Sequence, residues 1–211
     1  MPYRLFVPKA YDKASKYPLV LWLHGAGAVG SDNFRQISGD QIMGTRTWTR
    51  PEVQAKYPAF VLVPQTLGSW SISGGDVELP QGLTLVLEIL ESLKAEFSID
   101  PQRLYVAGQS MGGNGAWLLI TVRPDLFAAA IPLCGGGDPT RAAAIAKMPV
   151  WAFHGDRDLS IPVSESRKMI QALRKAGGKP RYTEYRRVGH DVWLTAFKEP
   201  ELVDWVFAQR R

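Results

Sequence analysis

A serine placed between two glycines is the residue of this chain best suited to nucleophilic chemistry. Ser110 lies in the segment Gly108-Gln109-Ser110-Met111-Gly112, directly after the apolar run 104–107. Lifting a serine hydroxyl clear of a sheet requires a sharp strand-to-helix turn. Side chains two residues before and after the serine would collide across that turn, so glycine is favoured at both positions. The segment therefore predicts a nucleophile elbow with Ser110 as the nucleophile.

A serine nucleophile needs a base, and the chain has three histidines from which to choose. His24 and His154 each follow a predicted strand and precede a glycine, whereas His190 lies on a loop after the last predicted strand. The order of a serine, an acid and then a histidine along the chain is one of the orders in which such triads occur. We therefore predict that His190 is the base and that His24 is structural.

Two aspartates compete to orient this imidazole, Asp156 and Asp158 in the segment His154-Gly155-Asp156-Arg157-Asp158. The nearer aspartate is well placed to fix its own loop by accepting hydrogen bonds from backbone N–H groups. The farther one can reach back towards an imidazole. Spacing favours Asp158 and leaves Asp156 open.

The oxyanion of an acyl-transfer reaction needs at least two hydrogen-bond donors. The amide of Met111 is one candidate, because it opens the helix that must follow the elbow. The Ala26 amide in the turn His24-Gly25-Ala26-Gly27 is the second. The alternative is that this turn is a plain glycine connection after a strand.

Other polar and aromatic residues give weaker signals. The Gly135–Gly137 run lacks the Gly-Lys-Ser/Thr ending of a phosphate-binding loop. His154, Asp156 and Asp158 lie at alternate positions of one loop with no cysteine nearby, which disfavours a metal site. Trp70, Gln109 and Trp193 are candidate substrate contacts, and buried packing is the alternative for the two tryptophans.

Strands and helices alternate along the chain, which predicts a three-layer α/β/α sandwich around a mostly parallel sheet. Asp100-Pro101 predicts a turn before the strand that leads to Ser110, and the loop 66–82 is long enough to overhang a site. The interval between Cys134 and Val150 is too short for a lid domain. Strands are expected at 3–8, 19–23, 60–63, 104–107, 128–133, 150–153 and 182–186, and helices at 83–97, 111–122, 141–146, 163–176 and 199–209.

Bulk composition describes an ordinary globular chain of 211 residues, and we expect residues 1–211 to form a single catalytic domain. The net charge of +5 comes from scattered Lys and Arg, which argues against nucleic-acid binding. One cysteine, Cys134, excludes an intrachain disulfide. No run could span a membrane and no signal peptide is recognisable, so we expect a soluble protein in an undetermined compartment; the abrupt start before a strand suits a domain of a longer, exported protein.

These residues resemble the phospholipase/carboxylesterase branch of the α/β-hydrolases, which includes predicted peptidases. The resemblance runs from Tyr3 to about Gln209 and rests on the segments 18–27, 108–113 and 153–158, and on Gly189-His190 with Trp193. It implies Asp158 as the acid, Ala26 and Met111 as oxyanion donors, and no metal or organic cofactor. Leading strands common in that branch are missing before Tyr3, which leaves the oligomeric state open.

The sequence therefore predicts a serine carboxylesterase that takes short acyl or aromatic, feruloyl-like esters at an open site. Ser110, His190 and Asp158 are its expected triad, and a small-molecule ester is its expected partner. A serine peptidase with the same triad is one alternative. A non-catalytic binding module on a hydrolase fold is another. The acyl group, the alcohol and the physiological substrate are not determined by the sequence.

Overall fold

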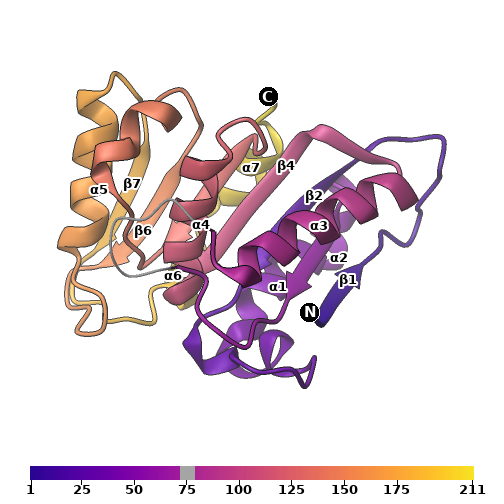
Figure 1. Cartoon of the computed structure of the whole chain (residues 1–211), viewed down its shortest axis with the longest axis horizontal. Helices are drawn as coiled ribbons and strands as arrows, with labels where there is room; N and C mark the ends of the chain where they lie inside the picture. Colours follow the sequence, from indigo (N-terminus) through magenta and orange to yellow (C-terminus); the bar gives the residue numbers. More distant parts are fainter. Residues whose placement is uncertain (72–78) are drawn as a thin grey trace.

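A computed structural model describes residues 1–71 and 79–211. Over these residues, a seven-stranded sheet with the order β1-β3-β2-β4-β5-β6-β7 forms the centre of the molecule (Figure 1). Strand β1 is antiparallel to β3, and every other neighbouring pair is parallel. The strands are β1 (Tyr3–Phe6), β2 (Tyr17–Leu23), β3 (Phe60–Pro64), β4 (Ile99–Gln109), β5 (Ala129–Leu133), β6 (Trp151–Gly155) and β7 (Arg181–Tyr185).

Helices cover both faces of this sheet. One face packs against α3 (Gln81–Glu96), α4 (Met111–Val122), α5 (Ser164–Lys175) and the 3₁₀ helix η4 (Pro139–Ile145). The other face packs against α1 (Ile42–Thr49), α6 (Trp193–Ala196) and α7 (Leu202–Phe207). The described residues also contain α2 (Pro51–Lys56), η1 (Ala26–Ala28), η2 (Arg35–Ile37) and η3 (Gly39–Gln41). The expected three-layer sandwich is confirmed.

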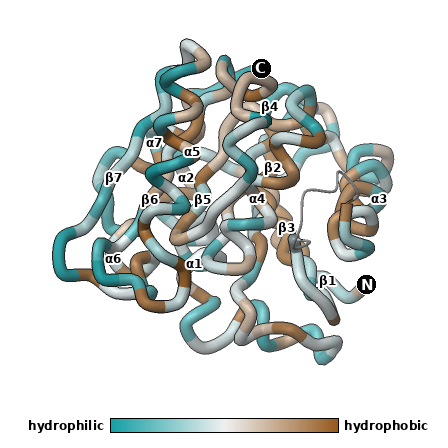
Figure 2. The backbone as a smooth tube through the Cα atoms, turned by 60° about the vertical axis from the view of Figure 1, so that its left-hand side comes forward, coloured by the Kyte–Doolittle hydropathy of each residue, from teal (hydrophilic) through white to brown (hydrophobic). Residues whose placement is uncertain are grey.

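The alternation of side chains along β2 shows why the sheet has two cores. All seven residues of β2 are buried. Leu19, Leu21 and Leu23 pack in the core beneath α3 and α4, whereas Val20 and Trp22 pack in the core beneath α1 and α6. Because successive side chains of a strand point to opposite faces, a strand covered on both sides must be apolar throughout. An edge strand is covered less completely and can carry polar residues. Figure 2 shows this difference, because the central strands β2 and β3 are largely hydrophobic and the edge strand β7 is mainly hydrophilic.

The turn predicted at Asp100-Pro101 is wrong, because both residues belong to β4. The register against β2 explains the pattern. Tyr17 pairs with Ile99 and Leu19 pairs with Leu104, so β4 carries extra residues in a bulge between the two pairs. A proline in a central strand is tolerated at a bulge, where no ladder hydrogen bond is required from it.

The connection between β5 and β6 contains η4 and no inserted lid. In the loop 66–82, the segment 72–78 lies outside the described residues, so the expectation that this loop overhangs a site concerns residues not described here. In an open α/β sheet, ligands and catalytic groups gather at the carboxyl ends of the parallel strands, and the candidate site residues follow those ends.

Candidate active site

Ser110 lies on a strained turn between β4 and α4. Its backbone has φ 55° and ψ −119°, a conformation that costs an ordinary residue about 1–3 kcal/mol. A Cβ on Gly108 would lie 2.2 Å from the carbonyl oxygen of Gly112, and one on Gly112 would lie 2.0 Å from the carbonyl oxygen of Leu23. Both glycines are therefore required by backbone contacts, as the sequence pattern predicts for a nucleophile elbow.

The structure brings Ser110, His190 and Asp158 into one hydrogen-bonded chain. The Ser110 hydroxyl lies 2.7 Å from His190 Nε2, and His190 Nδ1 lies 2.7 Å from Asp158 Oδ2. The three residues follow β4, β7 and β6 respectively. With Nδ1–H donating to the carboxylate, Nε2 is the acceptor for the serine proton.

A glycine at the end of β6 lets the histidine loop reach this position. A Cβ on Gly155 would lie 2.3 Å from the carbonyl oxygen of Val188 and 2.4 Å from that of Gly189. The Arg157 N–H also donates to the Val188 carbonyl at 3.0 Å. The loop that carries His190 thus crosses directly over the end of β6, next to the aspartate.

Asp158 is held so that its Oδ2 faces the His190 imidazole. Its Oδ1 accepts the backbone N–H groups of Ser160 and Ile161 at 2.8 and 2.9 Å, while Oδ2 faces His190. Burial raises the pKa of this carboxyl, but the hydrogen bonds from His190, Ile161 and Ser160 outweigh it and leave the pKa below its ordinary value. Asp158 is therefore ionised at neutral pH.

Asp156, the other acid considered from sequence, has a different role. Its Oδ1 accepts the backbone N–H of Arg187 at 2.6 Å, which ties the β6 loop to the β7 loop. It forms no hydrogen bond with His190 among the described residues. Of the two aspartates, the structure places only Asp158 against the imidazole.

Two backbone amides at helix starts are the candidates for binding an oxyanion. Met111 is the first residue of α4 and Ala26 is the first residue of η1. Within the described residues, neither amide N–H donates to a protein acceptor. Unsatisfied N–H groups at a helix start, aided by the dipole of α4, are suited to binding a developing negative charge.

The turn that carries the Ala26 amide is fixed by side chains on both sides. His24 Nδ1 lies 2.7 Å from the Gly25 carbonyl oxygen, and Gln41 Oε1 accepts the Gly25 N–H at 2.8 Å. The Gly25 carbonyl and the Ala26 N–H belong to one planar peptide and point in opposite directions. Anchoring the carbonyl therefore fixes the direction of the N–H.

His24 is a buried and neutral part of this support. Its Nε2 accepts the Thr66 N–H at 3.2 Å, so the proton is on Nδ1 and donates to Gly25. Burial lowers the pKa of His24, and the Gly25 carbonyl opposes this only in part. The roles of the Gln41 side chain and the Thr66 backbone N–H were missed from sequence, because single contacts from residues 16 or more positions away give no local pattern.

The candidate substrate contacts remain predictions. Trp70 is completely buried, and its Nε1–H donates to the His24 carbonyl at 3.0 Å, so packing describes it in this structure. Gln109 is buried beside Gly25 and has no hydrogen-bond partner for Oε1 among the described residues. The Trp193 ring is nearly perpendicular to the His190 ring at a centroid distance of 5.5 Å.

Cys134 lies beside the hydrogen-bonded chain but is not set up to bind a metal. Its sulfur lies within 4.8 Å of donor atoms of Asp158 and His190. Burial raises the pKa of the thiol well above its ordinary value, so it remains protonated. The two partners are already hydrogen-bonded to each other. We therefore derive no metal site from this cluster.

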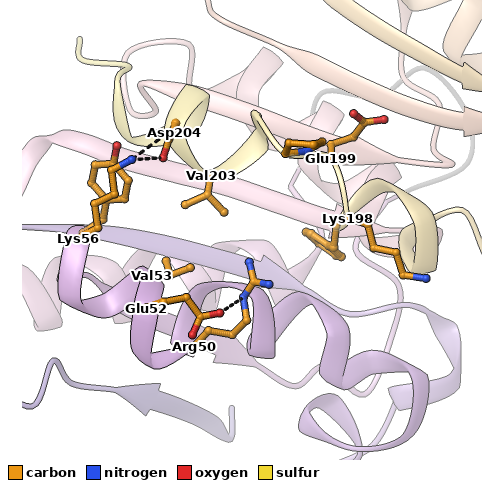
Figure 3. A pocket seen from close by; sticks show the side chains of 11 residues that line it. Arg50, Glu52, Val53, Lys56, Lys198, Glu199, Val203 and Asp204 are labelled. Carbon is orange, nitrogen blue, oxygen red and sulfur yellow. Dashed lines mark hydrogen bonds and ion pairs between the residues drawn. The ribbon is translucent and has the colours of Figure 1, made fainter.

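A cleft of about 390 Å³ lies between α2 and the segment 197–204 (Figure 3), and none of the candidate site residues lines it. Its charges are largely neutralised in pairs. Lys56 Nζ lies 2.9 Å from both Asp204 oxygens, and Arg50 lies 3.4 Å from Glu52. The cleft is therefore a charged surface groove with no group prepared for chemistry.

The fold and the hydrogen-bonded chain at the ends of its strands define an α/β-hydrolase. The chain belongs to the dienelactone hydrolase family, whose model matches residues 80–200. The expected membership of the α/β-hydrolases is thereby confirmed. The match includes Ser110, Asp158 and His190 and excludes the turn at Ala26.

Relatives with esterase names support this class. The chain is 27% identical over 177 residues to a probable feruloyl esterase C of Aspergillus terreus, covering 83% of this chain and 62% of the fungal protein. It is 25% identical over 206 residues to a probable inactive carboxylesterase of Oryza sativa subsp. japonica, covering 87% and 82%. A solved thermostable esterase matches with a TM-score of 0.93 and 40% identity, covering 99% of this chain and 59% of that one.

The family and the relatives named esterases support a carboxylic ester hydrolase as the class of this chain, while the rice relative is named as inactive. The chain spans about three fifths of the length of the Aspergillus terreus protein and of the thermostable esterase. Among the described residues, no helix has the length and apolar character needed to cross a membrane.

Proposed function

We propose that residues 1–211 form the catalytic domain of a serine carboxylesterase with Ser110, His190 and Asp158 as its triad. The observation that carries this proposal is the hydrogen-bonded chain from Ser110 Oγ through the imidazole to Asp158 Oδ2, with both donor–acceptor distances at 2.7 Å. The strained φ of Ser110 supports it, because such strain concentrates at functional sites.

The mechanism follows from the directions of these groups. His190 Nε2 takes the proton of Ser110 as Oγ bonds to the ester carbonyl carbon, and Asp158 stabilises the resulting imidazolium. The Ala26 and Met111 amides donate to the oxyanion. The tetrahedral intermediate then expels the alcohol, which takes the proton from His190. Water, deprotonated by His190, then attacks the carbonyl carbon of the acyl-enzyme. The bond from that carbon to Ser110 Oγ breaks, Oγ takes the proton back from His190, and the acid leaves.

We propose short acyl or aromatic, feruloyl-like esters as the substrate class. The expected partner is thus a small-molecule ester and not a nucleic acid. The absence of a lid between β5 and β6 supports an open site. Relatives named feruloyl esterase support the aromatic acyl group. A panel of p-nitrophenyl esters graded by chain length, with methyl ferulate included, tests this. We expect kcat/KM to fall with chain length beyond short acyl groups, and a preference for long chains would contradict it.

Replacing the nucleophile tests the proposed activity itself. Ser110→Ala is expected to lower kcat/KM on p-nitrophenyl acetate by at least about 10⁴-fold, because loss of a serine nucleophile removes the covalent route. Ser15→Ala, an exposed serine before β2, is the matched control and keeps the wild-type rate. Turnover by Ser110→Ala within tenfold of wild type would contradict the proposal.

The two alternatives are outcomes of further assays on the same protein. Cleavage of peptide p-nitroanilides as efficient as that of p-nitrophenyl acetate would favour a serine peptidase. Failure of a fluorophosphonate probe to label Ser110 would favour a non-catalytic binding module. We expect slow or no peptide cleavage and rapid labelling.

A further inference from the structure

A second histidine contacts the carboxylate of the proposed triad. His154, the penultimate residue of β6, is completely buried. Its Nε2 lies 3.2 Å from Asp158 Oδ2, the same oxygen that His190 Nδ1 approaches at 2.7 Å. Asp158 Oδ2 is therefore flanked by two imidazoles, and the mechanism above uses only one of them.

The surroundings of His154 determine where its proton lies. Within the described residues, the two groups at hydrogen-bonding distance from Nε2 are both acceptors, the Ile161 carbonyl at 3.0 Å and Asp158 Oδ2. If Nε2 were unprotonated, its lone pair would face two oxygen acceptors and would have no hydrogen to accept. Nε2 must therefore carry hydrogen, which donates to the Ile161 carbonyl and lies beside Asp158 Oδ2, with 3.2 Å between nitrogen and oxygen.

The other ring nitrogen leaves room for the neutral form. Ser166 Oγ lies 2.8 Å from His154 Nδ1 and 2.8 Å from the Gly135 carbonyl oxygen. A hydroxyl has one hydrogen, so Ser166 can donate to only one of them. When it donates to Nδ1, His154 is neutral and its Nε2–H still donates to Ile161 and lies beside Asp158 Oδ2. Burial lowers the pKa of His154, and its contacts with Ile161 and Asp158 oppose this only in part, which favours the neutral form.

Of the titratable groups on the elements packed against β6, Asp158 is the charged group in direct contact with His154 among the described residues. Glu184 of β7 is opposite His154 in the sheet, but both its oxygens bind the Arg167 guanidinium of α5 at 2.6 and 2.9 Å. Tyr182 also donates to Glu184 at 2.7 Å. Cys134, after β5, remains a neutral thiol because burial raises its pKa.

We propose that His154 is a positioning residue that tunes how strongly Asp158 stabilises the His190 imidazolium, because its Nε2–H lies beside Asp158 Oδ2 at an N–O distance of 3.2 Å. The positive end of this N–H dipole offsets part of the charge on the carboxylate oxygen that His190 uses. Asp158 therefore stabilises the His190 imidazolium less than it would without His154. The inference rests on the proposed function for its kinetic readout.

A matched pair of variants tests this role. The amide nitrogen of Gln can occupy the place of a histidine Nε2, whereas that of Asn is closer to the place of Nδ1. His154→Gln therefore keeps the donor to Asp158, and His154→Asn keeps only the contact with Ser166. The acid limb of kcat/KM against pH reports the base in the free enzyme. We expect its midpoint to rise by about 0.5–1 pH unit in His154→Asn and to stay close to wild type in His154→Gln.

Equal midpoints in wild type and His154→Asn would overturn the proposal, as would equal shifts in the two variants. His24→Asn is a control for the loss of a buried histidine elsewhere in the site, and it leaves the midpoint unchanged whatever it does to kcat. A purely structural role for His154 would lower stability or kcat without moving the midpoint.

A second measurement needs neither folding of a variant nor turnover. Nitrogen-15 NMR of wild-type protein labelled at histidine distinguishes protonated from unprotonated ring nitrogens. We expect His154 Nε2 to be protonated from about pH 6 to 9, beyond the ordinary histidine pKa. An unprotonated Nε2 would overturn this proposal while leaving the esterase assignment intact. If wild-type protein hydrolysed no ester although His154 Nε2 was protonated, the proposed function would be contradicted and not this proposal.

Discussion

At the scale of single residues, the site shows how two nearly adjacent carboxylates come to do different work. Asp156 accepts a backbone N–H from the neighbouring loop, while Asp158 presents one oxygen to His190 and satisfies the other with two backbone N–H groups. Spacing along the chain favoured Asp158 without excluding Asp156, because the direction of each carboxylate depends on how the β7 loop crosses β6. That crossing is a tertiary contact with no local signature.

Asparagine substitutions separate the two aspartates by activity. Asp158→Asn is expected to lower kcat by about 10⁴-fold, because an amide facing His190 favours the wrong imidazole tautomer. Asp156→Asn keeps the acceptor for the Arg187 N–H and is expected to change kcat by less than tenfold. Steady-state rates on p-nitrophenyl acetate make the comparison. Equal losses in the two variants would contradict the assignment of the acid.

At the scale of elements, long periodic segments were predictable and short helices were not. The helix after the elbow was predicted at its observed bounds, because a glycine-framed serine and Arg123-Pro124 mark its two ends. The helix after β6 was found within one residue at each end. Helices α1, α2 and α6 were missed, since each has at most eight residues and helices this short depend on tertiary contacts that the local sequence does not show. The last helix is shorter than predicted for the same reason.

The start of η1 offers a direct test of the oxyanion donor. Proline is well accepted at the first position of a helix, and the extended backbone of the preceding Gly25 suits it. Ala26→Pro therefore removes one N–H with little change in the turn. We expect kcat to fall by about 10²–10³-fold, equivalent to about 2.7–4 kcal/mol of transition-state stabilisation.

Ala26→Ser keeps the amide N–H and serves as the control for this experiment. It is expected to retain most of the wild-type kcat. The melting temperature of both variants is measured alongside, so that loss of fold is not mistaken for loss of the donor. A folded Ala26→Pro variant with wild-type kcat would show that the oxyanion is bound elsewhere.

At the scale of the whole molecule, the site is coupled to the stability of the protein through its buried histidines. Burial lowers the pKa of both His24 and His154 below the ordinary value. In the unfolded chain both titrate near their ordinary pKa of about 6.5. Below that pH the unfolded state binds more protons than the folded state, so the free energy of unfolding falls as the pH falls.

We therefore expect stability to decline on acidification from about pH 6.5, by up to about 1.4 kcal/mol per pH unit for each of the two histidines. The lowered pKa of Asp158 adds a further loss only below about pH 4, where the unfolded carboxyl becomes protonated. Urea unfolding at about pH 7, 6 and 5 measures the slope, and His24→Asn is expected to reduce it. Stability that is independent of pH across this range would contradict the buried, neutral state of both histidines.

The central claim is that Ser110 forms a covalent acyl-enzyme, and rapid quenching tests it most directly. The protein is mixed with p-nitrophenyl acetate and quenched in acid within the first turnover. It is then digested, and its peptides are analysed by mass spectrometry. We predict an acetyl group on the peptide that contains Ser110, and its disappearance in Ser110→Ala. Acetylation of a different residue during productive turnover, or turnover with no acetylated intermediate and an unchanged rate in Ser110→Ala, would contradict the account.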